Sequence, residues 1–245
     1  MGCSIVIPTM NNSSFTIKCM DSILSYTEKP FKLVWVDNGS APEEWNSVSD
    51  KLGEFSDRGI PTMHVRFPVN QGFTAAVNAG IQLGGNDDVV LLNNDTMVSP
   101  EWLLKMQEAL RGDVGIVGVT SNDFDFQSLK NLHLPDVDHI TNANAVSRCG
   151  NKYDIICDVP MVAFFCVLIA RKVFNAVGPM SEDYRHGLAG DNEYCYMARK
   201  MGFRVVWRRD AYATHYGGKT FKALGIDRER IAAGERKRFK DRFDS

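Results

Sequence analysis

Residues 89–96 read VVLLNNDT, and this stretch decides the fold. Its first four residues are apolar, which is typical of a short strand buried on both faces. The strand ends at Asn93, Asn94 and Asp95. In open parallel sheets, ligands bind in a crevice outside the carboxyl ends of the strands. The stretch therefore predicts an internal strand that carries Asp95 to the edge of a ligand site.

Two earlier apolar stretches end in the same way. Residues 4–7 (SIVI) lead to Pro8 and Thr9, and residues 33–36 (LVWV) lead to Asp37. Helical patterns separate the apolar stretches, and this alternation is typical of a parallel α/β sheet. We therefore expect the α/β class, with a mostly parallel central sheet flanked by helices. Three polar strand ends at one edge of that sheet indicate a binding site.

The periodicity of apolar residues predicts the other elements. Helices are expected after a cap at Asn12 or Ser13, from Pro100, and at residues 43–52, 72–83, 191–201 and 227–243. Strands are expected at residues 64–67, 114–119 and 203–207, and a strand or a strand pair is expected through residues 167–170. Residues 120–150 are rich in Asn, Asp and Ser, which predicts a loop or a hairpin. No repeat or linker divides the chain, so we expect one fused domain of two parts.

The composition excludes several classes of protein. The chain has 245 residues, 44% of them hydrophobic, and its net charge of -2 argues against a general nucleic-acid binder. The longest apolar stretch, residues 159–170, is too short to span a bilayer, and the first residues lack a signal-peptide pattern. The six cysteines form no CxxC pair or zinc-spaced set. We therefore expect a cytoplasmic protein that contacts a membrane surface at most.

The sequence offers no glycine-rich loop to bind phosphate groups. It contains neither a Walker loop nor a GxGxxG motif. A divalent cation can hold a diphosphate instead, and hard cations prefer carboxylate oxygens as ligands. Asp95, directly after a buried strand, is placed to supply one.

An ordered series of motifs resembles the family 2 glycosyltransferases. The motifs are IVIPT (5–9), VDNGS (36–40), NQGF (70–73) followed by NAG (78–80), LLNNDT (91–96), GDNEYCYMARKMGF (190–203) and THYGG (214–218). Together they extend over residues 4–218. The resemblance implies a GT-A fold and sugar transfer with inversion at the anomeric carbon. A rhamnosyltransferase-like subgroup is one of the alternatives that it leaves open.

The resemblance also implies which residues bind the donor and a metal ion. Contacts with the nucleotide sugar are implied for Pro8, Thr9, Asp37, Asn70, Gly72 and Asn78. We expect such contacts for Asn94 and Lys219 as well. Asp95 and His215 are implied as ligands of a divalent cation, Mn²⁺ or Mg²⁺. Asn93 stands where the family has the first acid of its Asp-x-Asp metal motif.

Asp191 matches the position of the family's catalytic base, although Gly190 replaces the glutamate that usually precedes it. Inverting transfer needs a base that accepts the proton of the acceptor hydroxyl. A cation compensates the charge that grows on the departing diphosphate. We therefore expect a hexosyltransferase-type enzyme that uses a UDP, dTDP or GDP sugar. The expected acceptor is a saccharide or lipid-linked saccharide, as in polysaccharide biosynthesis.

The expected domain covers residues 1–225, with a nucleotide-sugar-binding half at 1–119 and an acceptor-binding half at 120–225. A basic helical tail at 226–245 follows. Its Lys and Arg residues, with apolar residues among them, would suit contact with an anionic membrane surface. A solvated helix is the favoured interpretation of this charge pattern.

Each implied role has a structural alternative. Asp37 and Asp95 also suit turns, Asp191 also suits a helix N-cap, and His215 also suits a structural role. A degenerate protein that binds a nucleotide sugar without turnover stays open, because two motif positions depart from the family pattern. A sugar nucleotidyltransferase is disfavoured, because no glycine-rich loop follows the first strand.

Overall fold

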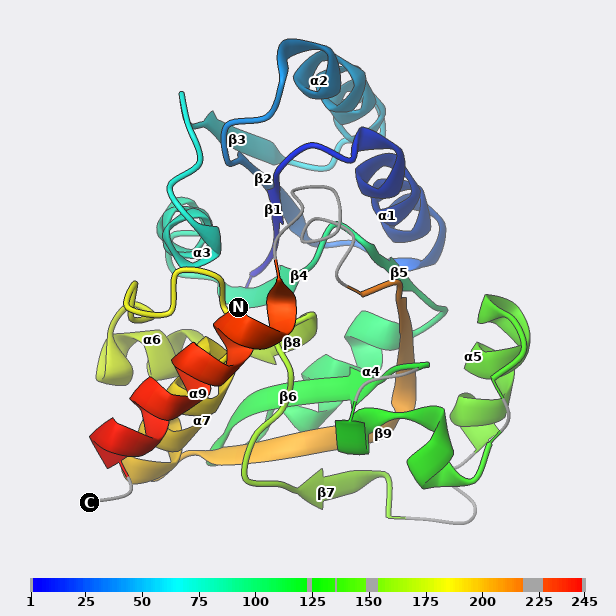
Figure 1. The fold of residues 1–245 in the computed structure, drawn as a ribbon. Coiled ribbons are helices and arrows are strands. Elements are labelled where there is room, and N and C mark those ends of the chain that lie inside the picture. Colours follow the sequence, from blue (N-terminus) through cyan, green and yellow to red (C-terminus); the bar gives the residue numbers. More distant parts are fainter. Residues whose placement is uncertain (1, 123–124, 135, 149–153, 218–226, 244–245) are drawn as a thin grey trace.

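A single mixed sheet forms the centre of the molecule, and helices cover both of its faces (Figure 1). The computed structural model describes residues 2–122, 125–134, 136–148, 154–217 and 227–243. The strands are β1 (Cys3–Thr9), β2 (Lys32–Asp37), β3 (Thr62–Arg66), β4 (Asp88–Leu92), β5 (Thr96–Val98), β6 (Val114–Thr120), β7 (Ile156–Asp158), β8 (Cys166–Ile169) and β9 (Arg204–His215). The helices are α1 (Ser13–Tyr26), α2 (Pro42–Asp57), α3 (Phe73–Leu83), α4 (Trp102–Ala109), α5 (His139–Ser147), α6 (Arg171–Val177), α7 (Gly190–Lys200) and α9 (Arg228–Phe243).

The first half of the sheet is parallel, in the order β3-β2-β1-β4. Every residue of β1 is buried, as expected for a strand covered on both faces. The register pairs Thr9 with Asp37 and Asp37 with Arg66, so these strands end at the same edge. The predicted α/β class is confirmed, and the polar strand ends do meet at one edge.

The second half of the sheet mixes strand directions. β8 is antiparallel to both β4 and β6, and so joins the two halves. β9 runs parallel to β6 and then antiparallel to the short β5, with a register shift after Val119 of β6. A strand of 12 residues can reach both partners, and its last residue, His215, lies opposite Thr96.

Two apolar clusters lie on opposite faces of the sheet. One packs α1, α2 and α4 through residues such as Met20, Phe55 and Trp102. The other packs α3, α6 and α7 through residues such as Val77 and Cys195. α3 is rich in small residues, which predicts close packing, and the structure agrees: a Cβ on its Gly80 would overlap the side chain of Val6.

Several predictions about elements were wrong. The region predicted as a loop or hairpin contains α5, whose first turn is capped by the carboxylate of Asp138. β5, β7 and α6 were not predicted. Asn12 does occupy the N-cap of α1, but its side chain makes no capping hydrogen bond there. The Glu44 carboxylate accepts from the backbone N–H of Ser13 instead, at 2.6 Å.

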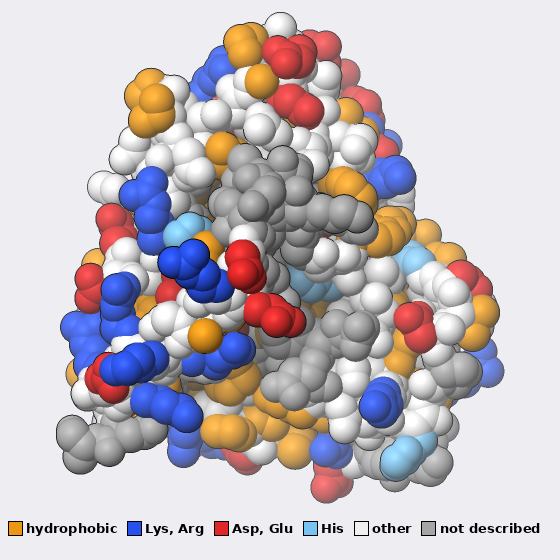
Figure 2. Space-filling model, in the orientation of Figure 1, with side chains coloured by type: hydrophobic (Ala, Val, Ile, Leu, Met, Phe, Trp, Pro, Cys, Tyr) orange, Lys and Arg blue, Asp and Glu red, His pale blue; other side chains and the backbone are white. Residues whose placement is uncertain are grey.

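The C-terminal helix α9 packs against the rest of the chain. It crosses in front of α7 in Figure 1, and Tyr196 of α7 contacts the rings of Phe239 and Phe243. Its buried positions are Ala232 and Glu235. The opposite side is exposed and basic, and Figure 2 shows Lys and Arg side chains gathered where α9 lies. Within the described ranges, no helix combines the length and the apolar character needed to cross a membrane.

Candidate active site

Asp95 and His215 form a pair at the edge of the sheet. Pairing of β5 with β9 brings them together across 120 positions of sequence, and the N–H of Tyr216 donates to the Asp95 carbonyl at 2.9 Å. His215 Nε2 lies 3.2 Å from Asp95 Oδ1, and both side chains are 10% exposed. The two residues that the sequence predicts as metal ligands are therefore neighbours in space.

Asn93 completes this corner of the site. Its Nδ2 lies 3.5 Å from His215 Nε2. Its Oδ1 is buried and, among the described residues, has no hydrogen-bond partner. Leaving a buried acceptor unpaired costs about 1–3 kcal/mol, so such an atom calls for an explanation. Asp95, His215 and the Asn93 amide oxygen together offer donor types that suit a divalent cation.

The described residues contain no cluster of three or more His, Cys, Asp and Glu side chains that could hold a metal ion. A cation at Asp95 and His215 would therefore take its other ligands elsewhere. Mg²⁺ typically binds through one or two carboxylates together with substrate phosphates and water. The residues present fit a cation that binds together with a diphosphate.

Asp191 lies in the first turn of α7, where its side chain is half-buried. The N-cap of this helix is Ala189, so the alternative N-cap role of Asp191 is wrong. Burial raises the pKa of Asp191 to about 6, and the Glu235 carboxylate adds to the rise, while the N–H of Asn192 opposes it. A carboxylate with a pKa near 6 is well matched to proton transfer close to neutral pH.

Residues 162–165 connect the surroundings of Asp191 with the corner of the site that Asp95, His215 and Asn93 form. The Val162 carbonyl faces Cys195, one turn after Asp191 on α7, at 3.9 Å from its Sγ. The Phe165 carbonyl accepts from the N–H of Asn93 at 2.8 Å. Three peptide units span at most about 11 Å. Residues 162–165 therefore link the helix that carries Asp191 to the strand end that carries Asp95.

The loop before α3 is held by a network of amides. Asn38 Nδ2 donates to Asn70 Oδ1 at 3.1 Å and to the Gly72 carbonyl at 3.0 Å. Gly72 has φ 100°, and a Cβ there would lie 2.6 Å from Arg185 Cγ. Asn70 and Gly72, both predicted to contact the donor, therefore shape the loop that precedes α3.

Asp37 and Thr9 are buried at the ends of β2 and β1. Asp37 Oδ2 lies 3.3 Å from Nε of Arg66, and the N–H of Ser40 donates to the same carboxylate. The Thr9 hydroxyl accepts from the indole N–H of Trp35 at 2.8 Å. Pro8 is buried beside Thr9 in β1. These side chains build the edge of the sheet, and their predicted contact with a nucleotide stays a prediction.

The other predicted donor residues lie in different surroundings. Asn94 is buried and donates to the Thr16 hydroxyl at 3.0 Å. Asn78 exchanges hydrogen bonds with the backbone of Met180 and lines a cavity of about 550 Å³ between α3 and α6. Lys219 lies outside the described residues.

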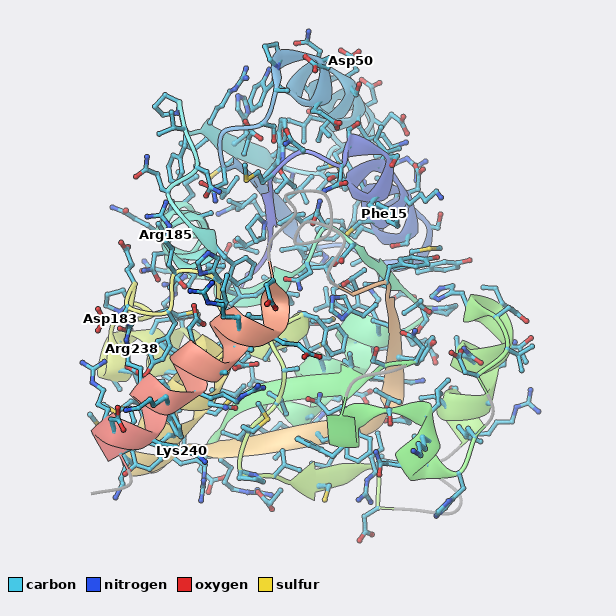
Figure 3. The ribbon with its side chains drawn as sticks, in the orientation of Figure 1. Phe15, Asp50, Asp183, Arg185, Arg238 and Lys240 are labelled. Carbon is cyan, nitrogen blue, oxygen red and sulfur yellow. The ribbon has the colours of Figure 1, made fainter. Side chains whose placement is uncertain are left out.

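Two charged residues near the site were missed at the level of sequence. Arg185 donates to the Asn70 carbonyl at 3.0 Å, and its own carbonyl accepts from Phe73 at 2.8 Å. Figure 3 shows Arg185 beside α3. Glu235 of α9 binds the loop that leads to Asp191. Neither residue belongs to a motif, and only the tertiary structure brings them to the site.

Comparisons with known proteins show which family and fold the chain resembles. Residues 4–178 match the model of the family described as Glycosyl transferase family 2. An uncharacterised protein of Sinorhizobium fredii is 27% identical over 234 residues, which is 87% of this chain and 24% of that protein. Chondroitin synthase of Pasteurella multocida is 25% identical over 251 residues, covering 89% of this chain and 25% of the synthase. The chain thus spans about a quarter of the length of these two relatives.

The fold has a counterpart among solved structures. A mannosyltransferase from Pyrobaculum calidifontis, in complex with GDP-Man and Mn²⁺, superposes with a TM-score of 0.69. The match covers 91% of this chain and 59% of the other, at 16% sequence identity. At that identity the likeness concerns the fold alone, and it confirms the predicted GT-A fold.

Proposed function

The chain belongs to glycosyl transferase family 2, and on this premise we propose that it moves a sugar from a nucleoside-diphosphate sugar to an acceptor hydroxyl with inversion. One observation supports the proposal most. Asp191 is a half-buried carboxyl with a pKa of about 6, and residues 162–165 link its helix to the Asp95–His215 pair. A base and a group of residues that binds the diphosphate are what this reaction needs.

Asp191 acts as the general base in this proposal. Its carboxylate accepts the proton of the acceptor hydroxyl while the hydroxyl oxygen attacks the anomeric carbon. The bond from that carbon to the diphosphate oxygen breaks on the opposite face, so the configuration inverts. No covalent bond between enzyme and sugar is required.

Asp95, His215 and the amide oxygen of Asn93 would hold a divalent cation. When bound, such a cation supplies Lewis-acid compensation for the charge on a departing diphosphate. The relative from Pyrobaculum calidifontis was solved with GDP-Man and Mn²⁺, which supports a donor and a cation of these classes. His215 Nε2 and Asp95 Oδ1 lie 3.2 Å apart, a separation that two ligands of one cation can have.

The proposed donor is a UDP, dTDP or GDP sugar, and the proposed acceptor is a saccharide or a lipid-linked saccharide. The exposed basic side of α9 would suit the anionic surface on which a lipid-linked acceptor is presented.

The replacement Asp191→Asn tests the base. UDP-GlcNAc, GDP-mannose and dTDP-rhamnose are each incubated with the chain and Mn²⁺, and release of the nucleoside diphosphate is measured. We expect Asp191→Asn to lower kcat by about 10²–10⁴-fold while the dissociation constant of the donor stays near the parental value. Parental kcat in the variant would remove Asp191 from the mechanism. Donor binding without turnover in the parent would favour a degenerate binding protein.

Removal of the metal tests the cation. We expect EDTA to abolish release of the nucleoside diphosphate and excess Mn²⁺ to restore it, because the Asp95 corner depends on a cation to engage the diphosphate. Circular dichroism with and without EDTA serves as the control for folding. Full turnover in EDTA would contradict the role given to Asp95 and His215.

A further inference from the structure

Glu235 of α9 is a buried carboxylate, 6% exposed. One of its oxygens accepts from the backbone N–H of His186 at 3.1 Å, and the other accepts from that of Leu188 at 2.8 Å. His186 Nδ1 also lies 3.5 Å from Oε1. Burial of a carboxylate is costly unless hydrogen bonds compensate it. Both oxygens of Glu235 therefore bind the loop that precedes α7 and contains His186 and Leu188.

The fastened loop ends at the proposed base. Its first part is attached to α3, because the Tyr184 carbonyl accepts from the Thr74 hydroxyl at 2.6 Å and the Arg185 carbonyl accepts from Phe73. Its second part reaches Gly190, the first residue of α7, and Asp191 follows directly. Glu235 is bound to this second part, three residues before the base.

Other contacts hold α9 in the position from which Glu235 binds the loop. Arg242 lies 3.4 Å from carboxylate oxygens of both Asp183 and Glu193. Arg238 donates to the Asp183 carbonyl, and Figure 3 shows these two residues facing each other. Rings of α9 pack on Tyr196 of α7. Helix α9 thus contacts residues that precede Asp191 in the sequence and residues that follow it.

We propose that Glu235 is a positioning residue for Asp191, and that α9 is therefore a working part of the transferase site. Glu235 holds residues 186–188 so that the first turn of α7 presents the Asp191 carboxylate to the acceptor hydroxyl. This inference rests on the proposed role of Asp191 as base. The Glu235 charge also contributes to the raised pKa of Asp191.

The test compares Glu235→Gln and Glu235→Ala with the control Glu229→Gln. Glu229 is an exposed acid in the first turn of the same helix, so its replacement removes an equal charge without touching the loop. Glu235→Gln keeps the size of the side chain, which provides a folded variant if Glu235→Ala unfolds. The readouts are backbone amide exchange at residues 184–190, steady-state kinetics with the nucleotide sugar from the panel above that the parent turns over best, and the pH dependence of kcat/KM.

We expect amide exchange at His186 and Leu188 to accelerate in both Glu235 variants and not in the control. We expect kcat to fall by about 10–100-fold, because small misplacements of a reacting group are costly, while the donor KM changes less than about 2-fold. The acidic limb of the pH profile should move to lower pH, because Glu235 no longer raises the pKa of Asp191. The other titratable groups near this pair, His186 in the loop and Cys195 on α7, are unchanged in all variants.

Unchanged amide exchange would show that Glu235 does not hold the loop, and parental kcat with accelerated exchange would show that the base needs no such support. Either result overturns the inference. The proposed function is judged separately: it fails if the parent turns over no nucleotide sugar or if Asp191→Asn is as active as the parent.

Discussion

Burial at the start of α7 stabilises the protonated form of Asp191, whose pKa rises from 3.8 to about 6. In the unfolded chain the same carboxyl ionises at its ordinary value. Between pH 4 and 6 the folded state therefore holds more protons at this position than the unfolded state does. The neutral carboxyl of Asp191 contributes its full share to the free energy of unfolding below pH 3.8, the ordinary pKa. This contribution is lost as the pH rises through about 6.

This linkage predicts that Asp191→Asn stabilises the protein above pH 6 while it slows transfer. The amide carries no charge to bury, so we expect a gain in the free energy of unfolding at pH 8 of at most about 3 kcal/mol, and a much smaller gain at pH 4. Urea unfolding of parent and variant at both pH values measures it. The control Asp50→Asn, at an exposed position of α2, should show no such dependence on pH. A gain of the same size at both pH values would contradict the assignment of a buried, ionised Asp191.

At the scale of elements, the first half of the chain could be predicted well because β1, β2 and β4 are buried apolar runs and the helices between them have a clear period. β9 was predicted only as far as Trp207, because the next residues, Arg208 to Asp210, look like a turn. Arg208 and Asp210 are nevertheless buried within the strand, where they pair with each other. α5 was missed because its buried face includes Asn142, whose amide is satisfied by Asp136 and Tyr212.

The residues of the candidate site also divide into those that the sequence could predict and those that it could not. The proximity of Asp95 and His215 could be predicted because both belong to motifs that resemble a family; their role as metal ligands stays a prediction. Arg185 and Glu235 could not, because their roles come from contacts between elements distant in sequence. A carboxylate that binds backbone N–H groups leaves no pattern in the sequence around it.

Close packing of α3 on the sheet gives a prediction at this scale. We expect Gly80→Ala to destabilise the protein by about 1–3 kcal/mol, because the new Cβ would overlap Val6 and lie 3.2 Å from Val36 Cγ2. The matched control is Gly53→Ala in α2, where a Cβ meets nothing within 4 Å. That change should stabilise the protein by about 0.5–1 kcal/mol. Urea unfolding measures both, and equal effects of the two substitutions would contradict the described packing.

At the scale of the whole molecule, β8 joins the parallel half of the sheet to the rest. Leu168 is fully buried and lies opposite Val90 of β4 and Val117 of β6. The two halves therefore share one strand. Their unfolding should be coupled, because neither can lose β8 without exposing apolar surface of the other.

The replacement Leu168→Ala tests this coupling. We expect it to destabilise the chain by about 2–5 kcal/mol and to leave a single transition, with tryptophan fluorescence and far-ultraviolet circular dichroism coinciding. Trp35 reports on the first half and Trp207 on the second. Two separate transitions in the variant would show that the halves unfold independently.

The length of β9 has a consequence for the proposed cation site at His215. Side chains alternate between the faces of a strand, and Thr214 already contacts His139 and Tyr212 on one face. His215, next along, points to the other face and to Asp95. Deleting a single residue anywhere between Arg204 and Thr214 would exchange these faces and turn the imidazole away from the carboxylate. The proposed cation site thus depends on backbone pairing that begins far from it, at the other end of β9.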